Sequence, residues 1–356
     1  MRNTRLTHGP DGLNSGVWPV PTDCLITATE DFFTRSHAPI PSIDVATWRL
    51  EVGGLVKRPA RFSLTDLART FPAHEVTATV ACAGIRREEF LSLRPMPGEL
   101  PWGPEPISTA QWRGVSLAAV LESVGVSSRA HHVELVGMDR VTRQGQTFGF
   151  GGSVDLAKAL QRDVLLATEM NGSALPPQHG YPLRALVPGW IGARSVKWLG
   201  TINLLEEPSD NYFQARAYRS QRQIANDDSR DVSGGVALTV IPVNSVIVDP
   251  PAHASIPSGT RRVRGWAIGL DGEPLSSVEI SSDGGNSWSR AMITLPGEKW
   301  SWSFWEAEVT LPSGNHVLAA RATDVRGATQ PASIQETWNV KGYNNNAWHR
   351  VPVTAQ

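Results

Sequence analysis

Cysteine is scarce in this sequence, and so is any excess of charge of one sign. The 356 residues include only two cysteines, Cys24 and Cys82. Two cysteines are too few for a disulfide framework, which favours a reducing compartment. Basic and acidic residues nearly cancel, to a formal charge of -1. This balance gives no reason to expect a nucleic acid or a membrane surface as the partner.

Long apolar runs and nucleotide-binding motifs are also missing. The opening residues lack the apolar core of a secretory signal, and no later stretch is long and apolar enough to span a bilayer. We therefore expect a cytoplasmic protein, or a periplasmic one if a leader was removed. Neither GxGxxG nor a P-loop occurs where such a motif would need to sit, which argues against nicotinamide-dinucleotide and P-loop nucleotide chemistry.

The residues that are present predict two domains. With 356 residues, 40% of them hydrophobic, the chain can bury a substantial core. Residues 1–40 are rich in Pro, Gly, Asn and Thr and predict an extended arm. Residues 41–220 alternate short helices with strands, without strict βαβ spacing, which is typical of a mixed α+β domain. Strands are expected at 48–52, 76–81, 132–136 and 164–167, and helices at 63–69, within 112–124 and at 154–160.

The pattern changes after a polar linker at 221–236. Residues 237–356 contain alternating, strand-like runs separated by turn signals, as in an immunoglobulin-like β-sandwich. The stripe Trp300, Trp302 and Trp305 is most simply the core between two sheets, whereas an exposed pair would mark a dimer face or a carbohydrate platform. Strands are expected at 263–268, 277–281, 300–305, 316–321 and 333–338.

Cys82 lies in the most informative stretch of the chain. Strand-forming residues lead up to it, Gly84 permits a sharp turn, and Arg86 and Arg87 follow. Guanidinium groups beside a thiol favour its deprotonation. A thiolate is a nucleophile of acyl-transfer enzymes and also a ligand for soft metals, while a lone cysteine is often only a core residue. The stretch alone leaves these interpretations open.

Residues 170–199 form a second unusual stretch. Many Gly and Pro residues stand there among His179, Arg184, Arg194 and Lys197. Loops of this composition wrap an anion and expose backbone donors to it. The alternative is a solvated basic loop, which the interspersed large apolar residues disfavour.

Several short motifs follow one another in a recognisable order. They are Thr34-Arg-Ser-His37, Cys82-Ala-Gly-Ile-Arg-Arg87, Met170-Asn-Gly172, His179-Gly-Tyr-Pro-Leu-Arg184, Gly192-Ala-Arg-Ser-Val-Lys-Trp198 and Trp348-His-Arg350. With this order, the chain resembles the sulfite oxidase family of molybdenum enzymes from about residue 30 to residue 352.

The resemblance implies an α+β domain that holds molybdenum on one pyranopterin dithiolene, and an immunoglobulin-like domain that joins two copies as a homodimer. It implies that Cys82 is the protein ligand of the metal. The residues that it assigns to the substrate pocket are Arg35, Arg87, Trp102, Tyr218 and Lys341. The residues that it assigns to the pterin and its phosphate are Phe33, Thr34, Arg35, Ser36, His37, Asp139, His179, Arg184, Ser195, Val196 and Lys197.

Three positions depart from the family pattern. Ser36 and Ile85 each replace an asparagine, which changes hydrogen bonding around the site more than metal ligation. Lys341 replaces a pocket arginine, so it keeps the charge but loses the bidentate fork that grips an oxyanion. Animal members also carry a haem domain ahead of the molybdenum domain, and the arm before residue 40 is too short for one. No haem is therefore expected.

The implied reaction is oxidation of sulfite to sulfate by oxygen-atom transfer, with electrons passed to a cytochrome, another carrier or dioxygen. The alternatives on the same fold are a nitrate reductase and an S- or N-oxide reductase. Tyr218 favours sulfite, because nitrate reductases of the family generally lack the pocket tyrosine, and stand-alone S-oxide reductases generally lack the sandwich. An alternative of another class is a non-catalytic binding protein, in which the Trp-rich sandwich binds glycan or protein and Cys82 only packs.

Overall fold

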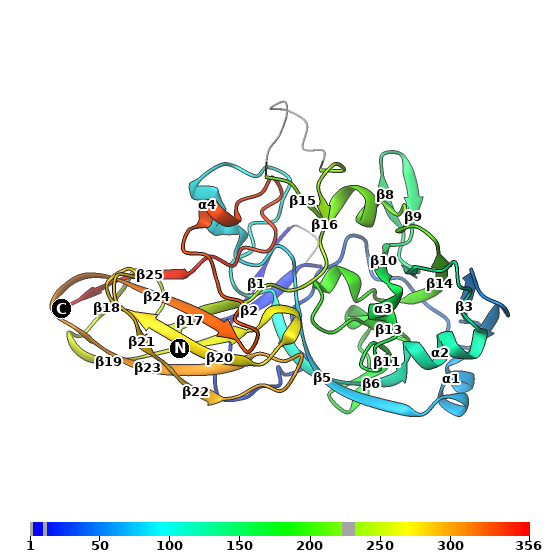
Figure 1. Ribbon diagram of the computed structural model, residues 1–356, viewed down its shortest axis with the longest axis horizontal. Coiled ribbons are helices and arrows are strands. Elements are labelled where there is room, and N and C mark those ends of the chain that lie inside the picture. The colour runs from blue at the N-terminus through cyan, green and yellow to red at the C-terminus, as the bar shows by residue number, and fades with distance from the viewer. Residues whose placement is uncertain (1–2, 10–12, 223–231) are drawn as a thin grey trace.

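The computed structural model describes residues 3–9, 13–222 and 232–356. A mixed unit of helices and sheets lies at the right of Figure 1, and a β-sandwich lies at the left. The predicted fold class, an α+β domain followed by a sandwich, is confirmed. The predicted linker falls largely outside the described residues; the strands β15 (Arg219–Ser220) and β16 (Val236–Ala237), on either side of the gap, pair with each other.

Two sheets form the first unit. One has the order β10 (Gly151–Asp155), β7 (His132–Gly137), β14 (Leu199–Leu205), β3 (Leu50–Gly54) and β4 (Ala60–Phe62). The other has the order β12 (Ser173–Ala174), β11 (Leu165–Met170), β6 (Ile107–Ser116) and β5 (Ala73–Ala81), with β13 (Arg184–Leu186) beside β11. A hairpin of β8 (Val141–Arg143) and β9 (Gln146–Phe148) projects from this unit.

The helices of the first unit are short. They are α1 (Leu64–Thr70), α2 (Leu117–Val124) and α3 (Leu156–Ala159). Ser63 caps α1, and Asp66 completes a capping box, as the sequence predicts for 63–69. No helix among the described residues is long and apolar enough to cross a bilayer.

The helix expected within 112–124 begins later than its first residues suggest. The strand β6 continues to Ser116, because Gly114 lies against β11 where a side chain would meet the backbone oxygen of Leu166 at 2.0 Å. Only a glycine permits that approach. The helical spacing of apolar residues is therefore restricted to α2.

The arm is built into the first unit. Strands β1 (Thr4–Thr7) and β2 (Ser15–Trp18) form a hairpin, and the backbone of Ser15 pairs with that of Thr34. Phe32 and Phe33 then enter a hydrophobic cluster around β5 and β6. The arm is thus more structured than an extended tether, and it brings residues 33–37 to the end of β5.

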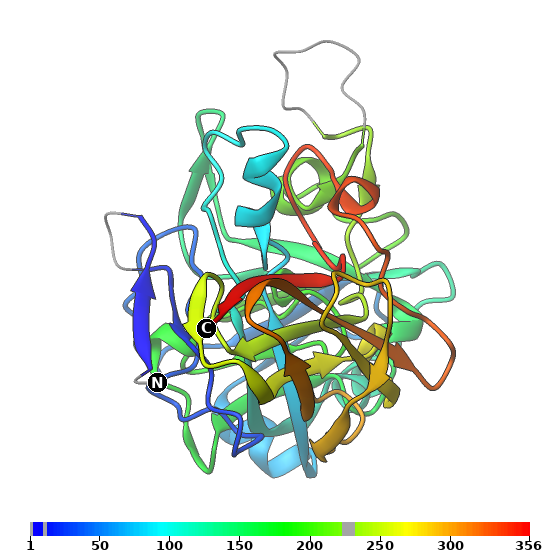
Figure 2. The ribbon, with the colours of Figure 1, turned by 90° about the vertical axis from the view of Figure 1, so that its left-hand side faces the viewer.

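The second unit is the predicted sandwich, which faces the viewer in Figure 2. One sheet has the order β17 (Asn244–Asp249), β19 (Gly259–Ile268), β23 (Ser303–Leu311) and β22 (Met292–Leu295). The other has the order β18 (Ala254–Ile256), β25 (His349–Ala355), β24 (Gly314–Asp324), β20 (Leu275–Ser281) and β21 (Ser289–Arg290).

Three expectations for the sandwich were wrong, wholly or in part. The strand expected at 300–305 begins only at Ser303. Residues 333–338 are not a strand: Ser333 and Glu336 form a capping box that starts the helix α4 (Ile334–Thr337). Of the tryptophan stripe, only Trp305 lies in the core between the sheets.

The other two tryptophans of the stripe join the two units. The indole nitrogen of Trp300 donates to Asp163, and the backbone oxygen of the same residue accepts from Thr79 on β5. The backbone N–H of Trp302 donates to the Thr79 hydroxyl, 2.9 Å away. These contacts fix the sandwich against the strand that leads to Cys82.

Candidate functional site

Cys82 lies directly after β5, where the strand ends against the second unit. The backbone N–H of Cys82 donates to the oxygen of Pro106 at 2.9 Å, and its sulfur accepts from the N–H of Gly84 at 3.4 Å. A side chain on Gly84 would meet the guanidinium of Arg87 at 2.8 Å, so the glycine leaves room for that guanidinium. Cys82 is buried, and its side chain borders two cavities.

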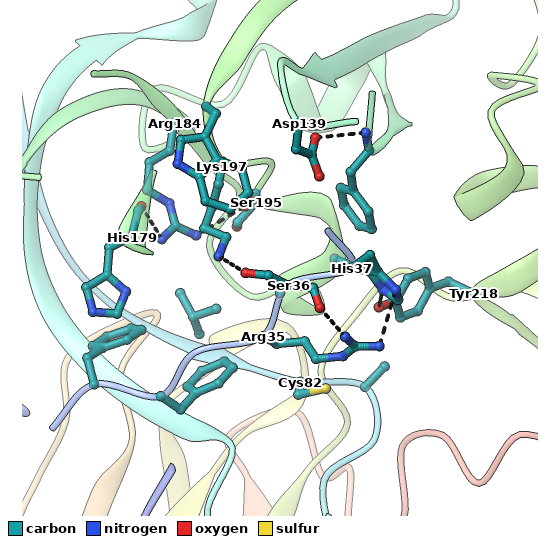
Figure 3. Close-up of a pocket in the computed structure, with 18 residues that line it drawn as sticks. Arg35, Ser36, His37, Cys82, Asp139, His179, Arg184, Ser195, Lys197 and Tyr218 are labelled. Atoms are coloured by element: carbon teal, nitrogen blue, oxygen red, sulfur yellow. Dashed lines mark hydrogen bonds between the residues drawn. The ribbon is translucent and has the colours of Figure 1, made fainter. Parts of the chain in front are cut away.

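The inner cavity contains about 700 Å³ of space not filled by protein atoms, part of it open to solvent. Figure 3 shows its labelled polar residues arranged around the central space, with Cys82 at one edge. Its apolar walls come from residues such as Phe32, Phe33, Val80 and Phe150. The predicted cofactor residues that line it are Phe33, Arg35, Ser36, His37, Asp139, His179, Arg184, Ser195 and Lys197.

Two cations in the inner cavity are held by neutral oxygens. The Arg184 guanidinium donates to the backbone oxygens of His179 and Ser195, both at 3.1 Å. Lys197 Nζ donates to Ser36 Oγ at 2.7 Å and to the oxygen of Gln178 at 2.9 Å. Within the part of the chain that the structure describes, neither cation forms a salt bridge. Burial lowers the pKa of Arg184 to about 9, and burial with the charge of Arg184 lowers the pKa of Lys197 to about 7.

The remaining polar groups of this cavity add little negative charge. His179 is buried, and that burial lowers its pKa to about 3, which leaves the imidazole neutral. Asp139 is the only acid among the described lining residues; its Oδ1 accepts from the N–H of Phe150, and burial raises its pKa. Ser195 Oγ accepts from the N–H of Val187 at 3.0 Å. The cavity therefore carries an excess of positive charge.

A chain of hydrogen bonds links Arg35, His37 and Tyr218 beside Cys82. Arg35 Nη2 lies 3.3 Å from His37 Nδ1, and His37 Nε2 lies 2.9 Å from the Tyr218 hydroxyl. Burial first, and then the charge of Arg35, lowers the pKa of His37 well below its usual value. Burial raises the pKa of Tyr218 to about 12. At neutral pH, His37 is thus neutral and Tyr218 keeps its proton.

The outer cavity, with about 1230 Å³ of space not filled by protein atoms, part of it open to solvent, shares these groups with the inner cavity. Arg35, His37, Cys82 and Tyr218 border both cavities. Tyr218 follows a single π-helical turn, Phe213–Ala217, and its ring stacks on Tyr343 with centroids 5.4 Å apart. The predicted substrate residues that line the outer cavity are Arg35, Arg87, Trp102, Tyr218 and Lys341.

Glu99 also lines the outer cavity, and sequence reasoning missed it. Its Oε2 lies 3.4 Å from Arg87 Nη2, and its Oε1 lies 3.0 Å from Lys341 Nζ. Arg87 is held further by the backbone oxygens of Lys341 and Leu100. The sequence contained no signal for this pairing, because Glu99 stands in a Pro/Gly turn far from Lys341 in the chain.

Three residues of the basic and cofactor sets lie outside both cavities. Thr34 pairs with Ser15, and Val196 points into the hydrophobic core. Arg194 is buried and donates to the oxygen of Leu238, while its Nε and Nη1 have no hydrogen-bond partner among the described residues. Thr34, Val196 and Arg194 do not line either cavity, although each is close in sequence to residues that do.

Comparisons with known proteins identify both units. The model of the oxidoreductase molybdopterin binding domain matches residues 37–213, and that of the Mo-co oxidoreductase dimerisation domain matches residues 236–356. Sulfite oxidase from Gallus gallus is 37% identical over 91% of this chain and 72% of that protein. Sulfite oxidase from Arabidopsis thaliana is 35% identical over 92% of this chain and 87% of that protein.

Other relatives are longer than this chain. It spans 62% of the mitochondrial sulfite oxidase of Homo sapiens, with 36% identity, and 38% of the NADH nitrate reductase of Hordeum vulgare, with 35% identity. Among solved structures, the sulfane dehydrogenase SoxCD from Paracoccus pantotrophus has a TM-score of 0.79 over 99% of this chain and 90% of that chain. At 23% identity, that likeness shows the fold alone.

Fold and matches together define a molybdopterin-binding oxidoreductase with a dimerisation domain. Within that class, the chain belongs to the sulfite oxidase family of molybdenum enzymes.

The inner cavity fits a molybdenum pterin cofactor. Buried cations that have only neutral partners are costly unless an anion joins them, and a phosphate supplies that anion. Among the described residues, no group of three or more His, Cys, Asp or Glu side chains could hold a metal ion. A cofactor that brings its own metal would find the Cys82 sulfur at the edge of this cavity.

Proposed function

We propose that this protein oxidises sulfite to sulfate at the point where the two cavities meet. The observation that carries the proposal is that Cys82, Arg35 and Tyr218 border both cavities. A cofactor in the inner cavity and an oxyanion in the outer cavity would then approach each other at the cysteine sulfur. The sulfite oxidases among the relatives support this choice of substrate.

In this proposal, Arg184, Lys197 and His179 would hold the pterin and its phosphate in the inner cavity. Ser36 and Asp139 supply further polar contacts, and Cys82 ligates the metal. Molybdenum held there would supply oxygen-atom-transfer chemistry and a two-electron acceptor. Thr34 and Val196 act through the backbone that carries their neighbours, since they do not line the cavity.

The outer cavity holds the substrate. Arg35, Arg87 and Lys341 attract an oxyanion, and Trp102 forms part of the cavity wall. Removing one preorganised donor to a developing charge typically costs about 3 kcal/mol, so each of these contacts is able to matter for turnover. Over the whole reaction, sulfite and water give sulfate, two protons and two electrons.

The hydrogen-bond chain assigns a direction to the Tyr218 proton. Arg35 can only donate, so His37 Nδ1 is the acceptor in that contact. A neutral His37 then carries its proton on Nε2 and donates it to the Tyr218 oxygen. The Tyr218 hydroxyl hydrogen is left to point into the cavity. We infer that Tyr218 donates this hydrogen bond to the substrate.

An assay that compares oxidation with reduction distinguishes a sulfite oxidase from a nitrate reductase and from an S-oxide reductase. The protein is produced in a host that makes the molybdenum cofactor, and molybdenum per polypeptide is measured. Oxidation of sulfite with ferricyanide is then compared with reduction of nitrate and of methionine sulfoxide by reduced viologen. We expect molybdenum near one atom per chain and activity with sulfite. Activity confined to the reductive assays would refute the proposal, and a molybdenum-free protein would favour a non-catalytic binding function.

Three further expectations complete the proposal. The sandwich joins two copies as a homodimer, which sedimentation or light scattering tests. Electrons leave to a cytochrome, another carrier or dioxygen, and turnover with each acceptor ranks them. We further propose a cytoplasmic location, which cell fractionation tests.

A further inference from the structure

In the outer cavity, the Glu99 carboxylate contacts two cations at once. Its two carboxylate oxygens contact different cations: one is 3.4 Å from Arg87 Nη2 and the other is 3.0 Å from Lys341 Nζ. Among the described residues that line this cavity, Glu99 is the only acid. The carboxylate therefore bridges two of the cations that the proposed function assigns to the substrate.

The donors that Glu99 occupies are the ones available to a ligand. Arg87 Nε donates to the oxygen of Lys341 at 2.8 Å, and Arg87 Nη1 donates to the oxygen of Leu100 at 2.9 Å. The face of Tyr343 lies under the guanidinium, with Cζ 5.1 Å from the ring centroid. Backbone contacts thus fix the guanidinium in place, and Nη2 is the group left to face Glu99.

The backbone around Glu99 is anchored independently of its carboxylate. The N–H of Glu99 donates to the oxygen of Met96 in a turn, with Gly98 in the left-handed region at φ +83°. The next residue, Leu100, accepts the Arg87 bond. The side chain of Glu99 is 19% exposed, so its carboxylate can swing toward solvent while the turn stays in place.

We propose that the Glu99 carboxylate acts as a built-in competitor, which occupies the oxyanion position between Arg87 and Lys341 until substrate displaces it. The inference deepens the proposed function, on which it rests for the identity of the substrate. It also defines a ligand class: an anion with two oxygens on one atom, which reproduces the carboxylate bridge. Sulfite, sulfate and nitrate meet this description, whereas a sulfoxide offers one oxygen.

A competitor of this kind weakens the binding of every oxyanion that uses the same two cations, and this includes the product sulfate. Its displacement leaves neither cation unpaired at any stage, because carboxylate and ligand exchange places. The expected consequence is weak binding of sulfate, and hence easy product release. Removing the competitor should tighten sulfate binding without new contacts being made.

The test is a direct titration of sulfate into the oxidised, molybdenum-loaded protein at constant ionic strength, followed by calorimetry. Glu99→Gln and Glu99→Ala each remove the charge, and Glu122→Gln removes one exposed charge on α2 as the matched control. We expect Glu99→Gln and Glu99→Ala to lower the Kd of sulfate about tenfold, the usual scale for a hydrogen-bonded charge. The control should change the Kd less than about twofold, as for other exposed charges.

A charge-retaining variant and a measurement of folding complete the experiment. Glu99→Asp retains the charge with a shorter reach, so its Kd for sulfate should lie between those of wild type and Glu99→Gln. Melting temperatures identify any variant that fails to fold, and the other substitutions then decide. An unchanged or weaker affinity for sulfate in the folded charge-removing variants overturns the inference, even if sulfite is oxidised. Tighter sulfate binding in a protein that does not oxidise sulfite supports the inference and refutes the proposed function.

Discussion

The two cavities that meet at Cys82 differ in how their cations are balanced. In the inner cavity, Arg184 and Lys197 bond only to neutral oxygens among the described residues. In the outer cavity, Arg87 and Lys341 share the carboxylate of Glu99. Both cavities attract anions, but among the described residues only the outer cavity has a carboxylate in salt bridges with its cations; Asp139 of the inner cavity forms none with Arg184 or Lys197.

This difference corresponds to two kinds of ligand. An unpaired buried cation is costly to the empty protein, so a cavity built from such cations suits a group that binds once and stays. A cation that is already paired loses little when its ligand leaves, which suits a substrate and a product that exchange in every cycle. Substitutions in each cavity, and at the Cys82 that both cavities share, would break or sharpen this contrast.

The largest effect is expected for Cys82→Ser. A serine oxygen is a poorer donor to a soft metal than a thiolate, although it is nearly the same size. Turnover should fall by more than about 100-fold, the upper end of what residues around a metal ligand contribute. Cys24→Ser changes an exposed cysteine and is the matched control, with turnover expected to stay at the wild-type level. Undiminished sulfite oxidation by Cys82→Ser would show that the sulfur is not the metal ligand.

Lys197→Met addresses the inner cavity. The change removes a cation that lacks an acidic partner, so it should weaken retention of the pterin phosphate while leaving the cofactor-free protein as stable as before, or more stable. We expect molybdenum and pterin per chain to fall about tenfold, as for one lost charged hydrogen bond. Elemental analysis and pterin fluorescence measure this, with the exposed Lys57→Met as the control. Full cofactor content in Lys197→Met would contradict the role given to the inner cavity.

Lys341→Gln addresses the outer cavity and should have a smaller effect. The substitution removes one of the three cations proposed to hold the oxyanion and leaves Glu99 to Arg87 alone. We expect the KM for sulfite to rise about tenfold, with unchanged molybdenum content. Lys341→Arg should restore most of the loss, because it returns the charge and adds a second donor. A fall in molybdenum content would mean that the two cavities are not separate in function.

Much of the site could be predicted because its residues lie in local motifs. Cys82 and Gly84 lie close together at the end of a strand. Outside the site, Ser63 and Asp66 form a capping box, which predicts the start of α1. Arg184 and Lys197 stand in one Gly/Pro-rich stretch of the sequence, a pattern that can be recognised without knowledge of the fold, although Arg184 itself begins the strand β13. Features of this kind depend on residues that are neighbours in the chain, so the sequence is enough to predict them.

The features that were missed depend on contacts between distant segments. Glu99 meets Lys341 across 242 positions of the chain, and no local pattern encodes that pairing. Trp300 and Trp302 were assigned to the core between sheets from their spacing, but spacing does not say which domain covers a side chain. Gly114 looked like a residue of a helix until its approach to β11 was known.

The smallest expected effect is on the pH dependence of the free energy of unfolding, compared between the wild type and Lys197→Met. In the cofactor-free protein the pKa of Lys197 is lowered to about 7 from the usual 10.5, chiefly by burial. Between these pH values, the unfolded chain binds a proton that the folded protein does not, so the free energy of unfolding rises with pH. Lys197→Met lacks this contribution. From pH 7 to pH 9, the wild type should therefore gain stability relative to Lys197→Met, by at most about 1.4 kcal/mol per pH unit.

Urea unfolding of both proteins, produced in a host that cannot make molybdopterin, measures this difference. The cofactor-loaded pair provides the contrast, because a bound phosphate would keep Lys197 charged and remove most of the relative gain. Equal pH dependence of the two cofactor-free proteins would mean that Lys197 is already balanced by a group of the chain itself. The inner cavity would then resemble the outer one, and an unbalanced cation could no longer explain why one ligand stays and the other exchanges.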